Sequence, residues 1–155
     1  GAVLLVQGEL VCVDIVVQAG NRVWSDDVGA AIVWVGRVWQ AALADVGVES
    51  DVYDGPMQQH PWSRQVCFAG LGTGEVVPAG AGSHGRTGKL VGISQRRTRD
   101  WARFQTMCHL RWRPELVSAL VHAPRPTPAH VVSAAVTVPV DADRLAAAVV
   151  AALPS

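Results

Sequence analysis

The sequence predicts an α+β fold, and three patterns lead to this class. Residues 9–17 alternate between two sets of mainly apolar side chains, which is typical of a strand buried on both faces. Apolar residues recur at helical spacing through residues 28–46. The order of elements is strands, one long helix, further strands and then helices. We therefore expect one sheet with separate helices, not a strict alternation of strand and helix.

The long helix has clear start and stop signals. Ser25 is the expected N-cap, because two aspartates follow it and negative charge favours a helix N-terminus. Gly47 stands where a glycine commonly ends a helix. Gly29 and Gly36 lie inside the helix, where each costs about 1 kcal/mol relative to alanine. Their presence predicts close packing of the helix against a sheet.

The other elements are predicted from short apolar runs bounded by turn residues. A tight turn at Gln7 and Gly8 joins two opening strands, residues 2–6 and 9–17. An antiparallel pair is expected around an arginine-rich turn. The remaining expectations are strands at 50–53, 65–69, 75–77, 90–94 and 103–112, and helices at 114–120, 128–136 and 141–153.

Composition limits the class of protein. The 155 residues suit a single domain, 1–155, with a mainly helical part at 114–155. Half of the residues are hydrophobic, which excludes a disordered chain. Thirteen basic and 13 acidic residues balance, which argues against a nucleic-acid partner. No apolar run approaches the roughly 20 residues that span a bilayer, so no membrane partner is expected.

The cysteines and the start of the chain predict a cytoplasmic protein. Cys12, Cys67 and Cys108 are widely spaced and form no CxxC pair, which suits a reducing compartment. No cysteine pair has zinc-ligand spacing with a histidine, so no metal site is predicted. The start lacks the charged region and cleavage site of a signal peptide. It also opens inside a strand pattern, so we expect the natural domain to begin earlier.

The most distinctive stretch surrounds Lys89, the only lysine of the chain. Eight of the 13 basic residues lie between Arg86 and Arg113, with a single acid among them. Gly88 and Gly92 flank the lysine and would let the backbone approach a ligand closely. The stretch predicts a positive face for a phosphate or carboxylate ligand. A solvated strand start and hairpin turn is the alternative for Lys89 and for the arginines Arg96, Arg97, Arg99 and Arg103.

This stretch carries a family resemblance. The run HGRTGKLVGISQRRTRDWARFQ, residues 84–105, resembles the glycine–lysine–x–x–glycine–serine–(alanine)–glutamine–x–arginine segment of lipoate–protein ligases. These belong to the biotin/lipoate A/B protein ligase catalytic-domain family. The opening residues GAV, followed by GEL at 8–10, are similar to the tail of the family's arginine-arginine-x-glycine-glycine-glycine-x-valine strand pair. Two features differ: most of that glycine-rich motif is absent, and Phe104-Gln105 replaces the usual histidine-glycine.

The resemblance implies a mixed, largely antiparallel sheet with helices packed on one side. It also implies transfer of a lipoate or octanoate group, through an acyl-adenylate made from ATP and Mg²⁺, to an acceptor-domain lysine. The acceptor would be a lipoyl domain of a 2-oxoacid dehydrogenase or a glycine-cleavage H protein. Lys89 would lie beside the acyl carbonyl and stabilise charge developing on oxygen. The other residues implied to line the acyl-adenylate are Gly1, Ala2, Val3, Gly88, Gly92, Ile93, Ser94, Gln95 and Arg96.

Two other functions stay open. The run SRQVCFA, residues 63–69, resembles the cysteine-phenylalanine stretch of cysteine-dependent octanoyltransferases, which take the acyl group from acyl carrier protein. Cys67 would then be the nucleophile, assisted by Arg64 and with His60 or His84 as base. A small buried hydrophobic side chain is the structural alternative for Cys67, and Cys12 and Cys108 are expected in the core. The third function is an inactive domain that binds the acceptor through the basic face.

Overall fold

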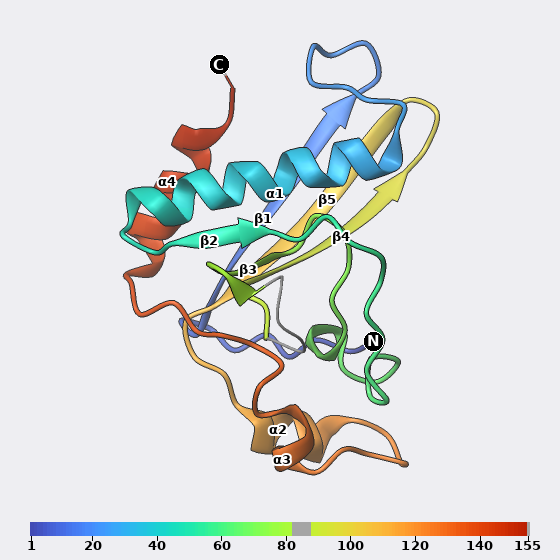
Figure 1. Cartoon of the computed structure of the whole chain (residues 1–155), viewed down its shortest axis with the longest axis vertical. Coiled ribbons are helices and arrows are strands. Elements are labelled where there is room, and N and C mark those ends of the chain that lie inside the picture. Colours follow the sequence, from blue (N-terminus) through green and yellow to red (C-terminus); the bar gives the residue numbers. More distant parts are fainter. Residues whose placement is uncertain (82–87, 155) are drawn as a thin grey trace.

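The computed structural model of the chain describes residues 1–81 and 88–154 (Figure 1). One five-stranded sheet has the order β1-β5-β4-β3-β2, and every neighbouring pair of strands is antiparallel. The expected α+β class, with a largely antiparallel sheet, is confirmed. The strands are β1 (Leu10–Gln18), β2 (Ser50–Val52), β3 (Val76–Pro78), β4 (Val91–Arg97) and β5 (Trp101–His109). The helices are α1 (Val28–Asp45), α2 (Pro114–Leu120), α3 (Pro128–Val131) and α4 (Ala142–Ala152), with a 3₁₀ helix at Cys67–Ala69.

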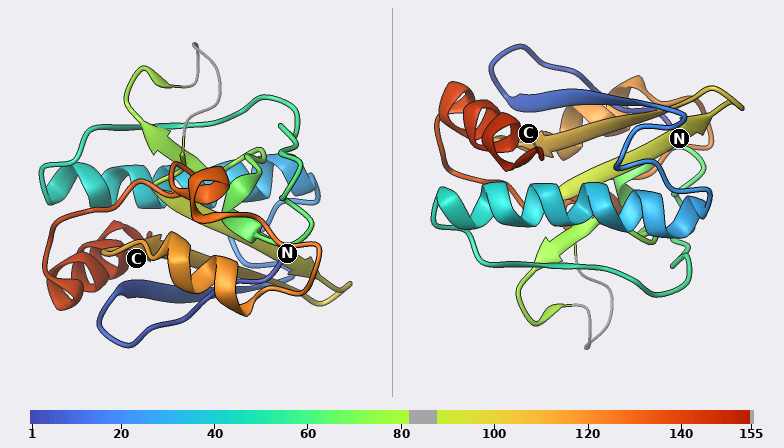
Figure 2. Two further views of the ribbon diagram at one scale, coloured as in Figure 1. Left: turned by 90° about the horizontal axis from the view of Figure 1, so that it is seen from below. Right: turned by 90° about the horizontal axis from the view of Figure 1, so that it is seen from above.

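Each face of the sheet carries a hydrophobic core. On one face, α1 and α4 pack together and against the long strands (Figures 1 and 2). The fully buried Trp39 and Leu43 of α1 and Leu145 of α4 belong to this core. A smaller core, with Phe68 and Val131 at its centre, lies toward α2 and α3, which gather at the end of the molecule away from α1 (Figure 1).

The ends of α1 follow their sequence signals, with one shift. Asp27, not Ser25, is the N-cap, because its Oδ1 accepts hydrogen bonds from Gly29 N at 2.7 Å and Ala30 N at 3.0 Å. Ser25 stands too early to reach these donors, and its hydroxyl instead accepts from Asp27 N. Gly47 follows the helix with φ +85°, as expected for a glycine at this position.

Gly36 lies where α1 comes closest to the chain that leads into β3. A Cβ on Gly36 would stand 2.2 Å from the carbonyl oxygen of Gly74 and 2.8 Å from Cγ1 of Val52 in β2. The predicted close packing against the sheet is therefore confirmed at Gly36. Gly29 has a different role, because its Cβ would meet only the capping carboxylate of Asp27 at 3.2 Å.

Gly36→Ala is expected to destabilise the protein by about 1–3 kcal/mol, because overpacking outweighs the gain of about 1 kcal/mol in helix propensity. Urea unfolding followed by circular dichroism measures the change. Gly29→Ala, in the first turn of the same helix, is the control, because its Cβ would meet a side-chain oxygen at 3.2 Å and no backbone atom. A Gly36→Ala variant as stable as Gly29→Ala would contradict the proposed contact.

Several expected elements are wrong or shorter than expected. Residues 2–6 form no strand and contribute only a bridge between Ala2 and Val66, and residues 65–69 contain the 3₁₀ helix. The arginine-rich turn is shorter than expected, because β4 ends at Arg97 and β5 begins at Trp101, which leaves residues 98–100 as the turn. The expected helix 128–136 stops at Val131, because Ala134 and Val136 hydrogen-bond to the backbone of Lys89. These contacts join segments far apart in the sequence.

Candidate functional site

Lys89 is buried in an ion pair with Glu75. The distance from Nζ to Oε1 is 2.5 Å, and the two side chains are 3% and 7% exposed. The same Nζ donates a hydrogen bond to the carbonyl oxygen of Cys67 at 3.3 Å and lies 5.1 Å from the centroid of the Phe68 ring. Because a buried charge is costly unless it is paired, this arrangement explains how the chain's only lysine can be inside.

Glu75 was not identified from the sequence. Its Oε2 accepts from Gly72 N at 2.7 Å, and its Oε1 also accepts from Ile93 N at 3.3 Å. The available sequence signal was an acid directly before two valines in a predicted strand. In the structure, Val76 and Val77 are both fully buried. A carboxylate at the head of such a strand needs a partner, but the sequence does not show which cation supplies it.

The N-terminal residues lie beside Cys67. Ala2 N donates to Gln65 O at 2.7 Å, and Cys67 N donates to Ala2 O at 3.0 Å. A Cβ on Gly1 would stand 2.7 Å from Cys67 N, so only a glycine fits this approach. The structure thus brings Gly1, Ala2, Cys67 and Lys89 together, although the sequence separates them widely. Val3 lies next to them and is exposed.

Gly88 and Gly92 lie where other segments of the same chain leave little or no space for a side chain. A Cβ on Gly88 would stand 2.2 Å from the carbonyl oxygen of Ser133. A Cβ on Gly92 would stand 3.0 Å from the Phe68 ring. Packing inside the protein therefore accounts for both glycines, and their contact with a ligand stays a prediction.

Strand β4 divides the predicted binding residues between the two faces of the sheet. Ile93 belongs to the core under α1, and Gln95, two residues on, lies on the same face. Neither polar side-chain atom of Gln95 has a hydrogen-bond partner among the described residues. Ser94 and Arg96 lie on the opposite face and are exposed. The structure therefore does not bring Ser94 and Gln95 to one surface.

The predicted positive face is partly neutralised by acids from elsewhere in the chain. Arg103 pairs with Asp14 of β1, and Arg113 pairs with Glu9 directly before β1. Arg111 lies 3.9 Å from the same Glu9 carboxylate. The hydrogen bond from Arg113 holds the pKa of Glu9 below its ordinary value. The pairing of β1 with β5 places Glu9 and Asp14 beside these arginines. Both acids lie outside residues 86–113, so the charge count of that stretch does not include them.

The other arginines of the stretch differ in exposure. Arg97 contacts the segment before α1, where it donates to the carbonyl oxygen of Ser25 and lies 4.3 Å from the Trp24 ring. Arg96 and Arg99 are exposed and form no ion pair with the described residues. Arg86 lies outside the described residues. Among the described arginines of this stretch, the exposed ones without an ion pair therefore lie on the β4–β5 hairpin.

The cysteines correct two of the sequence expectations. Cys67 is exposed, so the alternative of a buried hydrophobic side chain is wrong for it. Cys12 is also exposed, because it faces the side of β1 that the helices leave open, and its expected place in the core is wrong. Cys108 is in the core as expected, and burial raises the pKa of its thiol to about 12.

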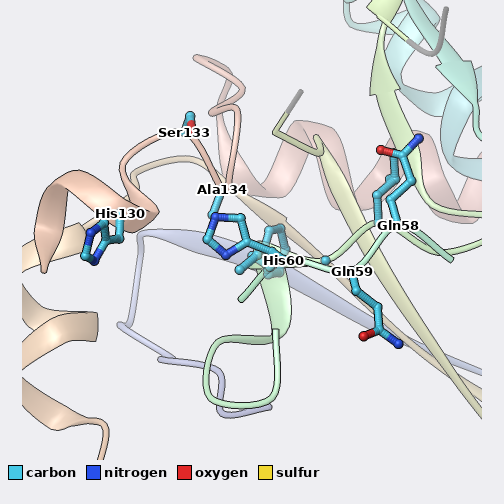
Figure 3. Close-up of a pocket in the computed structure, with 10 residues that line it drawn as sticks. Gln58, Gln59, His60, His130, Ser133 and Ala134 are labelled. Atoms are coloured by element: carbon cyan, nitrogen blue, oxygen red, sulfur yellow. The ribbon is translucent and has the colours of Figure 1, made fainter. Parts of the chain in front are cut away.

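A pocket of about 440 Å³ adjoins the Phe68 ring. Figure 3 shows His130, from α3, on one side, Gln58 and Gln59 on the other, and His60 between them. His60 Nδ1 accepts from Trp62 N at 3.1 Å, and His130 Nδ1 accepts from Thr127 N at 3.2 Å. The lining is rich in groups that can hydrogen-bond to a ligand. His84, the other histidine considered as a base, lies outside the described residues.

His109 is a buried histidine next to this region. Its ring packs edge-on against Phe68 at a centroid distance of 4.6 Å and against Trp112 at 4.9 Å. Its Nε2 has no hydrogen-bond partner among the described residues. Burial lowers the pKa of His109 to about 4, so the ring is neutral at pH 7.

Residues 1–81 and 88–154 contain neither a cluster of metal ligands nor a helix that could span a membrane. No group of three or more histidine, cysteine, aspartate or glutamate side chains there could hold a metal ion. None of the helices in these ranges combines the length and apolar character needed to cross a membrane.

Comparison with known proteins identifies the fold. No family profile and no curated protein matches the sequence. The crystal structure of lipoate–protein ligase A bound with ATP matches with a TM-score of 0.59 and 10% identity, over 91% of this chain and 49% of that one. A candidate lipoate protein ligase from T. acidophilum with bound lipoic acid matches with the same TM-score and identity, over 90% and 48%. The chain therefore has the fold of these lipoate–protein ligase structures and spans about half of their length.

Proposed function

We propose that this chain carries the acyl-transfer site of a lipoate- or octanoate–protein ligase. The observation that carries the proposal is the place of Lys89. Within a fold shared with lipoate–protein ligase structures, the only lysine lies buried beside Cys67 and the N-terminal residues. Two segments that resemble the ligases in sequence thus meet a third, residues 63–69, that resembles the cysteine-dependent octanoyltransferases. The similar structures are bound with ATP in one case and with lipoic acid in the other, which makes both suitable substrates to test.

The proposed role of Lys89 is electrostatic. In the transfer step, the acceptor amine attacks the acyl carbonyl, a C–N bond forms, the bond from carbon to the phosphate oxygen breaks, and AMP leaves with the electron pair. Negative charge grows on oxygen during this step, and a positioned ammonium stabilises it. Mg²⁺ would come with the nucleotide phosphates, because the described residues offer no cluster of protein ligands for it.

The intact mass of an acceptor domain tests the proposal. The domain is incubated with this chain, octanoate, ATP and Mg²⁺, and in a parallel tube with octanoyl-acyl carrier protein and no ATP. The ligase proposal expects a mass gain only with ATP. No gain in either tube would contradict acyl transfer by this chain and would favour an acceptor-binding domain.

Replacing the charged pair tests Lys89 itself. Lys89→Met combined with Glu75→Gln removes both charges, and we expect a transfer rate about 10²–10³-fold lower, the usual loss for one charge-stabilising donor. Arg37→Met, which removes an exposed cation from α1, is the matched control. Circular dichroism confirms that both variants are folded. Transfer by the double variant at the unmodified rate would exclude Lys89 from the site.

A cysteine-dependent octanoyltransferase is the second candidate, because Cys67 is exposed and its carbonyl accepts from Lys89. The thiolate would attack the acyl thioester of the carrier protein, release the carrier thiol and pass the acyl group to the acceptor amine. This candidate expects a mass gain only from the carrier and loss of activity in Cys67→Ser. Alkylation is tested in a Cys12→Ser background, because Cys12 is also exposed.

A further inference from the structure

The carboxylate of Glu75 is fixed by backbone groups from the turn before β3 and from β4. Gly72 N, in the turn before β3, donates to Oε2 at 2.7 Å, and Ile93 N, in β4, donates to Oε1 at 3.3 Å. Two backbone donors, one of them inside the sheet, hold the two oxygens and so fix the position of the carboxylate. Glu75 itself is 6% exposed.

The ammonium of Lys89 is held by this carboxylate. Lysine has three N–H donors on a flexible four-carbon side chain, so an acceptor must fix where they point. In the described part of the chain, Glu75 Oε1 takes one donor at 2.5 Å and Cys67 O takes a second at 3.3 Å. One donor is left. Phe68, whose ring lies 5.1 Å from Nζ, also lines the pocket of about 440 Å³.

Stability alone does not explain the pair. Replacing a buried ion pair with well-packed apolar side chains is often neutral or stabilising. The other 12 basic residues of the chain are all arginine, yet this buried position has the compact ammonium of a lysine. A small cation at a fixed point suits a donor that must meet one oxygen atom.

We infer that Glu75 is a positioning residue, whose carboxylate fixes the Lys89 ammonium so that its remaining N–H donor is aimed at the acyl oxygen. The second part of this inference, that the donor points at the acyl oxygen, rests on the proposed function. The fixing of the ammonium by Glu75 is independent of that function and can be tested without turnover.

The first test uses the fact that Lys89 is the only lysine. Sulfo-NHS acetate is added to the folded chain, and peptide mass mapping follows acetylation of Lys89 over time. Glu75→Gln keeps the size of the side chain but removes its charge, and we expect Lys89 to be acetylated at least about tenfold faster. Glu49→Gln, the same change at an exposed site, should leave the rate unchanged.

A second control separates positioning from loss of stability. Val77→Ala makes a cavity at a fully buried position of β3 and destabilises the strand without removing the Glu75 carboxylate. Acetylation is compared at temperatures where Val77→Ala and Glu75→Gln have equal stability. Faster acetylation only in Glu75→Gln supports the inference, and equal rates in the two variants overturn it.

The acyl-transfer assay then tests the direction of the donor. Glu75→Gln should lower kcat at least about tenfold with little change in KM for the acceptor, and Glu75→Asp should restore part of kcat. If the unmodified chain transfers no acyl group, the proposed function fails, and the acetylation result still decides whether Glu75 fixes Lys89. If transfer occurs and Glu75→Gln leaves kcat unchanged, Glu75 is not a positioning residue.

Discussion

Glu75→Ala is expected to lower the free energy of unfolding by about 3–5 kcal/mol, the usual cost of breaking a buried ion pair by removing one partner. Lys89 is only 3% exposed, so its ammonium would lose its carboxylate without gaining water. Whole domains are stable by about 5–15 kcal/mol, so this is a large part of the total. Urea unfolding at pH 7, followed by circular dichroism, measures the loss.

A double-mutant cycle separates the pair from its surroundings. Lys89→Met alone should also be strongly destabilising, whereas Lys89→Met with Glu75→Gln should cost much less than the sum of the single changes. Asp14→Ala breaks the exposed pair with Arg103 and serves as control, with an expected cost of at most about 1 kcal/mol. A Glu75→Ala variant as stable as Asp14→Ala would show that the buried pair contributes no more than a surface pair.

Acidification from pH 6.5 to about 4 is expected to cost the protein about 3 kcal/mol of stability through His109 alone, because its pKa falls to about 4 on folding. Above pH 6.5 the ring is neutral in both states, and the group has no effect on stability. Between pH 6.5 and 4 the unfolded chain binds a proton that the folded chain does not, so unfolding becomes easier. Below pH 4 the full cost is present.

His109→Leu isolates this contribution, because it keeps an apolar side chain between Phe68 and Trp112 and removes the titrating ring. Chemical unfolding is measured from pH 7 to 5, where the depressed pKa of Glu9 leaves its carboxylate charged. The stability of the variant should fall less than that of the unmodified chain over this range. Parallel pH profiles for the two chains would show that folding does not lower the pKa of His109.

Local signals predicted most of the fold. The alternation in β1, the periodicity of α1 and the start of α4 at Asp141 come from neighbouring residues, and the structure has them where expected. Residues 2–6 and 65–69 have the composition of strands but lack strand partners, and the sequence alone does not supply that information. The local sequence predicts which segments are apolar. Hydrogen-bonded pairing with a neighbouring strand then decides which of these segments become strands.

The same distinction applies to the candidate site. Lys89 was identified because it is unique, and that property belongs to the sequence itself. Glu75 was missed because its link to Lys89 depends on β3 lying beside β4. The neutralisation of Arg103 by Asp14 was missed for the corresponding reason at β1 and β5.

The contact between the first residues and Cys67 has a practical consequence for protein production. Ala2 hydrogen-bonds to the residues on both sides of Val66, through Gln65 O and Cys67 N, and Gly1 has no room for a side chain. Any residues attached before Gly1, whether a natural segment or a purification tag, would therefore start beside the candidate site. Helix α4 lies away from the N-terminus (Figure 1), so a tag attached after this helix would start away from the candidate site.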